Sequence, residues 1–416
     1  MNERRMALAA PLPRRQFGAI PRFARQVAIG LAMMGLGVLL SFAGLFSDIG
    51  MLYGRDQLWL HRRPYIDYPL EYPVGIGITN WLIALVAANQ QAYILITVAL
   101  LVAAGLGVLW LGRQFPAANL WLLVLAPAFA TYIALNWDLL AIAPTIAALL
   151  FLRQRRDSWA GLALALAIWT KFFPIVIVPL ILIDYLARGR WRAARRFSWP
   201  LVLGSLLINA PFALQFTAQG PRLRDGWLHF FRFNQARSQE ANLWALLAAW
   251  GAEFDTAQIN RASMVLMALG LALFGALLAW AVRRDPAGTV ERLPYAALAM
   301  LGWWFFFNKV YSPQYSLWLI ALLAILGAPP LLAATFALAD LLWLGAILLA
   351  VAERTWQDWM HAPLLLPPLA FREALILLII GWALRRMVRP TPQRAMSLEQ
   401  PTTELVPPPL RTAGQP

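Results

Sequence analysis

Long apolar stretches recur along the whole chain, and they limit its fold more than any other feature. Uninterrupted runs lie at residues 27–47, 92–112, 117–135, 138–152, 199–216, 262–282, 331–351 and 371–388. Two longer apolar tracts, 158–187 and 293–327, are each broken in the middle by polar residues. A helix of about 20 apolar residues is long enough to cross the hydrocarbon core of a bilayer. The runs therefore predict an all-α polytopic membrane protein.

The composition excludes several other classes of protein. Of the 416 residues 61% are hydrophobic and only 13% are charged, whereas about a quarter of a soluble domain is charged. The net charge of +15 would suggest nucleic acid as a partner of a soluble protein, but the apolar runs leave little surface for a DNA-binding patch. We therefore expect the lipid bilayer, and no nucleic acid, as a partner. The absence of cysteine excludes disulfides and thiolate metal sites.

The distribution of arginine predicts the topology, because short loops rich in Arg stay on the cytoplasmic side of a membrane. The Arg-rich segments are Arg4 to Arg25, Arg113, Arg153 to Arg156, Arg188 to Arg196, Arg283 with Arg284, and Arg385 to Arg389. All of these segments can lie on the cytoplasmic side only if the tracts between them cross the membrane an even number of times. This condition makes 117–152, 158–187 and 293–327 hairpins whose apexes point outward. The short run 74–88 is then a helix on the outer face.

This topology gives about 12 spans, with both termini on the cytoplasmic side of the cell membrane. The expected domains are a basic tail at 1–26, a transmembrane domain at 27–388 and a disordered Pro-rich tail at 389–416. The transmembrane domain would carry outer loops at 48–91 and 217–261.

The three hairpin apexes are polar. They are Asn136-Trp137-Asp138, the segment from Thr170 to Pro174, and the segment from Asn308 to Tyr315, and they include the protein's two lysines, Lys171 and Lys309. Arms of about 15 residues reach roughly 22 Å, which is less than the roughly 30 Å of the hydrocarbon core. A lysine at such an apex is therefore expected to line a cavity that contains water.

The loop after the first span is rich in carboxylates, tyrosine and proline between residues 48 and 73. Asp48 is expected at the outer end of the first helix, where a carboxylate gains nothing from the helix dipole. Such a residue is either solvated or retained for chemistry, and the sequence alone leaves both readings open.

Ordered motifs in this chain resemble those of a known enzyme family. The patterns are S-D-I-x-x-L-Y from Ser47, R-x-P-Y-x-D from Arg62 and E-Y-P-V from Glu71, followed by N-W-D, T-K-F-F-P and Y-S-P-Q-Y-S-L-W-L. In order and spacing, they are similar to glycosyltransferase family 87 of the GT-C superfamily, over about residues 27–388. The resemblance implies a GT-C-like helical bundle with juxtamembrane helices on its outer face. It also implies a polyprenyl-phosphate sugar as donor, with a glycolipid or glycan as acceptor.

The resemblance also implies roles for individual residues. Asp48 would be the general base of an inverting transfer, in which the lipid phosphate leaves as an anion and needs cations rather than an acid. Residues expected to bind the donor phosphate are Lys171, Lys309, Arg237, Arg62 and Arg63, with Arg55 as a further candidate. Residues expected to contact the sugar or the acceptor are Asp67, Tyr68, Glu71, Tyr72, Asn136, Asp138, Tyr311, Gln314 and Tyr315. Mannose is the favoured hexose because characterised relatives use it.

Structural alternatives remain for most of these residues. Either lysine could anchor a helix end at the membrane surface, and Asp138 could cap the helix 138–152. The stretch Tyr311 to Tyr315 could cap a hairpin, and 216–260, with Trp244 and Trp250, could contain an interfacial helix. Asp340 is an acid inside a span with no evident partner.

Cofactor and function keep alternatives as well. No Asp-x-Asp motif is present, so no cofactor is assigned and dependence on a divalent metal is left open. The main alternative function is a transporter or flippase of lipid-linked sugars, which would have repeated halves and a site at mid-membrane on discontinuous helices. A membrane scaffold without catalytic activity is a third alternative.

Overall fold

The computed structural model describes residues 19–43, 47–213, 226–286, 289–352 and 365–389. Within these ranges the chain is helical, with no β-strand. The sequence therefore predicted the fold class correctly. The two expected tails lie largely outside the described residues, and so do residues 214–225 of the second outer loop.

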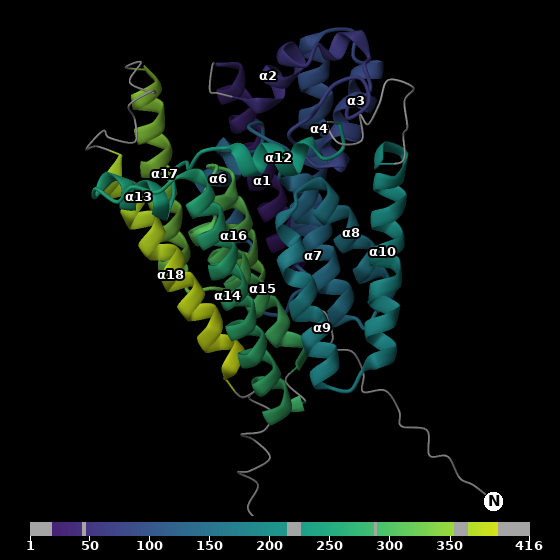
Figure 1. The fold of residues 1–416 in the computed structure, drawn as a ribbon, viewed down its shortest axis with the longest axis vertical. Helices are drawn as coiled ribbons and strands as arrows, with labels where there is room; N and C mark the ends of the chain where they lie inside the picture. The colour runs from purple at the N-terminus through teal and green to yellow at the C-terminus, as the bar shows by residue number, and fades with distance from the viewer. Residues whose placement is uncertain (1–18, 44–46, 214–225, 287–288, 353–364, 390–416) are drawn as a thin grey trace, which may run out of the picture.

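Five described helices are long and apolar enough to cross a membrane. They are α1 (Ala19–Phe42), α4 (Gln90–Gly112), α14 (Thr256–Arg284), α17 (Pro330–Ala352) and α18 (Leu366–Val388). Two helices of similar length, α10 (Trp191–Ala213) and α15 (Thr289–Phe307), lie in the same bundle in Figure 1. Shorter helices complete the bundle: α3 (Val74–Val86), α7 (Leu139–Arg153), α8 (Asp157–Thr170), α9 (Ile177–Ala187) and α16 (Tyr315–Ile325). The structure is that of a polytopic membrane protein, and the count of 12 spans stays a prediction.

The bundle has two different ends (Figure 1). The short helices α2 (Asp48–Arg55) and α12 (His229–Ala236) lie toward the upper end in that view, together with α3. We call this the loop end. The turn from α9 to α10 and the last residues of α18 lie at the lower end, which we call the arginine-rich end because it carries Arg188 to Arg196 and Arg385 to Arg389.

Glycines allow several helices of the bundle to approach closely. A side chain at Gly37 of α1 would overlap the backbone oxygen of Ala130, and one at Gly161 of α8 would overlap that of Phe197 in α10. In a membrane, where lipid and side chains are equally apolar, such small residues permit the backbone packing that holds helices together. These contacts fix α1 against α6 (Pro127–Thr131) and α8 against α10.

The structure corrects the prediction of a continuous span at 117–135. That stretch forms two short helices, α5 (Trp121–Val124) and α6, separated by Leu125 and Ala126. Proline has no amide hydrogen and forces the preceding residue into an extended conformation, so it ends α5 and begins α6. In the tract 158–187, a 3₁₀ turn, η2 (Phe173–Val176), separates two short arms as expected, but α8 packs mainly on α7 and α10 while α9 packs on α14.

The position of Asp48 also differs from the prediction. The first helix ends at Phe42, and Asp48 is the first residue of the separate helix α2, not the outer end of the first helix. The N-terminal end of a helix is the positive end of its dipole, so the carboxylate is stabilised there. For the run 74–88, the structure has the helix α3, packed against α4, α8 and the short turn η1 (Leu58–Leu60).

Candidate active site

The start of α2 is anchored on the turn that precedes α7. The Ser47 hydroxyl donates to the backbone oxygen of Ala134 at 2.6 Å, and the Asp48 amide donates to the backbone oxygen of Leu135 at 3.0 Å. These two bonds join segments almost 90 residues apart in the chain. They bring the side chain of Asp48 next to that of Asn136.

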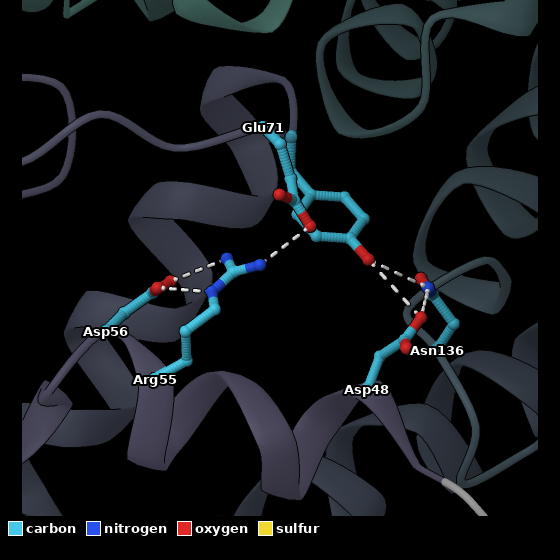
Figure 2. Close-up of polar contacts among 6 residues, drawn as sticks. Asp48, Arg55, Asp56, Glu71 and Asn136 are labelled. Carbon is cyan, nitrogen blue, oxygen red and sulfur yellow. Dashed lines mark hydrogen bonds and ion pairs between the residues drawn. The ribbon is translucent and has the colours of Figure 1, made fainter. Parts of the chain in front are cut away.

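Asp48 accepts two side-chain hydrogen bonds. The Asn136 amide donates to Oδ2 of Asp48 at 2.5 Å, and the Tyr72 hydroxyl donates to the same oxygen at 3.3 Å. The Asn136 amide also lies 3.2 Å from the Tyr72 hydroxyl. In Figure 2, Asp48 and Asn136 point toward each other, and Arg55 lies apart from them between Asp56 and Glu71. We call Asp48, Tyr72 and Asn136 the Asp48 group.

The surroundings of Asp48 shift its proton affinity in opposite directions. Burial raises the pKa of the Asp48 carboxyl, while the charge of Lys171 and the hydrogen bonds from Asn136 and Tyr72 lower it. Burial is the largest effect, so the pKa lies above the ordinary value of a carboxyl group. A carboxylate with a raised pKa is a stronger base than a solvated one, which suits a group that must accept a proton.

Lys171 follows α8 and contacts the Asp48 group from the next hairpin apex. Its side chain is buried, with Nζ 3.2 Å from Oδ2 of Asp138 and 5.0 Å from the centre of the Tyr72 ring. Asp138 also accepts a hydrogen bond at 2.8 Å from the indole of Trp318. Two alternatives from the sequence are therefore wrong. Lys171 does not extend to the surface, and Asp138 occupies the N-cap position of α7 without a capping hydrogen bond.

A second cationic pair, Lys309 and Arg237, is held by backbone pairing between two loops. The Glu240 amide donates to the Lys309 oxygen, and the Tyr311 amide donates to the Glu240 oxygen, both at 2.9 Å. The Lys309 ammonium donates to the backbone oxygen of Gln235 at 2.8 Å. Arg237 forms an ion pair with Glu240 at 2.5 Å.

The charges of this pair interact with each other, and the charge of Arg237 also interacts with Tyr72 of the Asp48 group. Burial and the neighbouring charge of Arg237 lower the pKa of Lys309 to about 8. Burial also lowers the pKa of Arg237, but the Glu240 contact and the hydroxyls of Tyr315 and Tyr72 outweigh it and raise that pKa. Arg237 thus interacts electrostatically with Tyr72, which relates this member of the cationic pair to the Asp48 group.

Four expected site residues lie apart from this site and order the first loop. Arg63 pairs with Asp67 at 3.3 Å, and Arg62 donates to the backbone oxygen of Asp67 at 2.8 Å. The backbone oxygen of Tyr68 accepts from the Tyr65 amide at 2.8 Å. The structure therefore does not bring Arg62, Arg63, Asp67 and Tyr68 into contact with the Asp48 group.

Glu71 occupies an intermediate position. Its carboxylate pairs with Arg55 at 3.0 Å, and Arg55 also pairs with Asp56 at 2.7 Å. The charge of Glu71 nevertheless contributes to raising the pKa of Asp48. Glu71 is therefore a neighbour of the Asp48 group that is already neutralised by an arginine.

Of the three expected contacts in the last apex, Tyr315 interacts with Arg237 of the cationic pair. The Tyr315 ring stacks on Phe305 with centres 5.0 Å apart, and its charge interaction with Arg237 is described above. Gln314 is buried at the N-cap position of α16 and makes no capping hydrogen bond. Tyr311 points instead into a separate buried cluster.

That cluster contains residues whose contacts sequence reasoning missed. The Tyr311 hydroxyl lies 2.8 Å from the Ser316 hydroxyl, Ser316 donates to Asp340, and the Arg372 guanidinium lies 3.7 Å from the Tyr311 ring centre. Tyr132 also donates to Asp340 at 2.9 Å. Asp340 therefore has partners, which the sequence did not reveal. A charge inside an apolar run was the one signal that such a cluster exists.

No group of three or more His, Asp or Glu side chains that could hold a metal ion occurs among the described residues.

The chain matches the model of glycosyltransferase family 87 over residues 70–313, which is more than half of its length. The matched segment contains Tyr72, Asn136, Lys171, Arg237 and Lys309, whereas Asp48 precedes it. No curated protein matches the chain. A match of this extent, together with the helical membrane fold, shows that the chain belongs to glycosyltransferase family 87 and is a membrane glycosyltransferase.

Proposed function

We propose that this glycosyltransferase transfers a hexose, with mannose as the expected sugar, from a polyprenyl-phosphate donor to a lipid-linked or glycan acceptor. The observation that supports the proposal is the Asp48 group. A buried carboxylate, held by two hydrogen bonds, interacts with the charge of Lys171, and Arg237, the neighbour of Lys309, interacts with Tyr72 of the same group. A transfer from a lipid phosphate needs this combination, a base for the acceptor and positive charge for the leaving phosphate.

The proposed reaction is a single displacement with inversion. An acceptor hydroxyl oxygen attacks the anomeric carbon of the donor sugar, and Asp48 accepts the hydroxyl proton. The bond between the anomeric carbon and the phosphate oxygen breaks, and its electron pair leaves with the polyprenyl phosphate. A β-linked donor therefore gives an α-linked product.

The cations would stabilise the charge that develops on the leaving phosphate. We assign this task first to Lys309, because within the described residues its ammonium donates to a neutral backbone oxygen and pairs with no carboxylate. Lys171 is already neutralised by Asp138 and instead packs over Tyr72. We assign Lys171 to keeping Tyr72 and the base in position.

The proposed location is the outer face of the cytoplasmic membrane, with both termini inside. The support is the arrangement of arginine, which gathers at the end of the bundle opposite the Asp48 group. Because the chain has no cysteine, single cysteines can report its orientation. A membrane-impermeant maleimide applied to intact cells should label cysteine at exposed position 63 and not at exposed position 155. The reverse pattern would refute this orientation.

The activity is tested with the purified full-length protein in lipid nanodiscs, a panel of polyprenyl-phosphate hexoses and glycolipid acceptors. We compare the wild type with Asp48→Asn, and we use Asp56→Asn as the matched control in the same loop. Loss of a general base lowers the rate by about 10²- to 10⁴-fold. The control should stay near the wild-type rate, because Asp56 contacts Arg55 and not the Asp48 group.

Two results would contradict the proposal. Turnover that is equal in the wild type and Asp48→Asn would exclude Asp48 as the base. Transport of a lipid-linked sugar across the bilayer, with no consumption of any polyprenyl-phosphate sugar, would favour the flippase alternative.

A further inference from the structure

The exposed side of α10, which faces away from the bundle, is divided into a basic part and an apolar part. On a helical wheel, in which successive residues are about 100° apart, nine exposed side chains of this helix fall within an arc of about 160°. They are Trp191, Arg192, Arg195, Arg196, Trp199, Val202, Leu203, Leu206 and Leu207. The opposite face, which includes Ala194, Phe197 and Gly204, is buried, and α8 packs closely on this helix. The exposed face is therefore one continuous surface on the outside of the bundle.

The charge on this surface is confined to the arginine-rich end. The three arginines lie within the first six residues of α10, and the helix contains no Asp or Glu. In the described part of the chain, none of the three forms an ion pair. They also lie at the positive end of the helix dipole, where an anion would be stabilised. The basic part thus carries positive charge that nothing in the described protein neutralises.

The apolar part follows the arginines along α10, toward the loop end of the bundle. Trp199 is 71% exposed, and Leu206 and Leu207 are 60% and 67% exposed. From Arg195 to Leu207 the helix rises about 18 Å, close to the roughly 15 Å of one leaflet of hydrocarbon. Trp199 lies at the boundary of the two parts, and an exposed tryptophan there is typical of the level of lipid headgroups. A membrane therefore meets the apolar part with acyl chains and the basic part with headgroups.

We propose that this face of α10 binds an anionic phospholipid. Arg192, Arg195 and Arg196 hold the phosphate through charge-assisted hydrogen bonds, and the acyl chains lie along Val202, Leu203, Leu206 and Leu207. Trp199 contacts the glycerol region between them. This site lies at the end of the bundle opposite the Asp48 group, and the proposal does not depend on the proposed function.

Charge complementarity distinguishes this occupant from a protein partner or a zwitterionic lipid. A zwitterionic headgroup brings its own ammonium, which would lie among three arginines. An anionic lipid neutralises them and covers the adjacent apolar surface at the same time. A soluble phosphate would gain only the first of these contributions, so it should bind much more weakly.

The test uses native mass spectrometry of the full-length protein, supplied with equal amounts of phosphatidylglycerol and phosphatidylcholine. The wild type should retain phosphatidylglycerol in several-fold excess. The variant Arg192→Gln/Arg195→Gln/Arg196→Gln should lose that preference. The matched control, Arg22→Gln/Arg25→Gln/Arg283→Gln, removes three exposed arginines at other helices and should keep it.

Each outcome decides the proposal. Equal retention of the two lipids by the wild type overturns the proposal without any variant. The proposal therefore stays refutable even if the triple variant misfolds. Equal loss of preference in both triple variants shows a diffuse effect of net charge and also overturns it. A further arm adds soluble glycerophosphoglycerol in place of the lipid. Thermal stabilisation by this headgroup alone, equal to that by the lipid, would refute the acyl contacts on α10.

Discussion

Replacing Lys309 with arginine should remove the alkaline limb of the pH-rate profile. The pKa of Lys309 is lowered to about 8 by burial and by the charge of Arg237. A lysine with a lowered pKa is charged below that value and loses its charge as the pH rises through it. If the proposed function is correct, donor capture falls over the same range, because the leaving phosphate loses its unneutralised cation. Arginine keeps its charge at every pH of the assay.

The size of the effect follows from this pKa. With a value of about 8, about 90% of the Lys309 side chains are protonated at pH 7 and about 10% at pH 9, against a value near 10.4 for an exposed lysine. The wild-type kcat/KM should therefore fall about tenfold between pH 7 and pH 9. Lys309→Arg should remain level over that range, even if its rate is lower throughout.

The assay measures kcat/KM for the polyprenyl-phosphate sugar, because this parameter reports the groups of the free enzyme. Lys171→Arg is the matched control, since it changes the chain's other lysine and leaves Lys309 intact. The position of the limb is compared, not the height of the profile. An alkaline limb near pH 8 that persists in Lys309→Arg, or that disappears in Lys171→Arg, would refute the reasoning.

Three further predictions concern the Asp48 group and the packing below it. Asp138→Asn should destabilise the protein by about 3–5 kcal/mol in denaturant titrations, because it leaves Lys171 buried without its carboxylate, and adding Lys171→Met should restore most of the loss. Asn136→Ala should move the acid limb of kcat/KM to higher pH, because the lost hydrogen bond favours the ionised base; an unchanged limb would argue against this contact. Gly37→Ala should lower the melting temperature through overlap with the backbone of α6, whereas Gly35→Ala, which meets nothing within 4 Å, should not.

The meeting of distant segments at one site could be predicted from topology. Arginine-rich turns and the even number of crossings predict the three apexes at the same end, and in the structure Asn136 and Lys171 contact the first loop while Lys309 contacts Gln235 of the second. This inference needs only charge and length, which the sequence states directly. The ordered motifs also indicated the family that the family model matches. The order and spacing of motifs can be read directly from the sequence.

The partner of each side chain could not be predicted in the same way. Lys171 was expected to bind phosphate, which stays a prediction, and its pairing with Asp138 from another apex was not foreseen. Asp340 had no evident partner, yet Ser316 and Tyr132 both donate to it, the latter from 208 residues away in the chain. Such pairs depend on helix rotation and on angstrom-scale offsets between helices. Hydrophobic periodicity carries little of this information in a bundle that is apolar all round.

Proline shows the same limit for the backbone. Pro127 separates α5 from α6, whereas Pro144 lies inside the continuous helix α7 and Pro200 inside α10. All three occur in apolar runs that read as single spans. In a membrane, neighbouring helices and side chains can satisfy the groups that proline leaves unpaired, so the outcome depends on tertiary contacts. The sequence therefore indicated where most helices lie but not the break in 117–135.

Neutralisation of the cations around the Asp48 group limits what the site can attract. Lys171 is balanced by Asp138 and Arg237 by Glu240, whereas Lys309 has a backbone oxygen as its recorded partner in the described chain. A polyprenyl-phosphate sugar is a phosphate diester with one negative charge, which matches one unbalanced cation. Transfer of the sugar frees a second phosphate oxygen, and the nearby Arg237 can stabilise its developing charge. Under the proposed function, the same arrangement would bind the donor modestly and its transition state more tightly, which is the condition for catalysis.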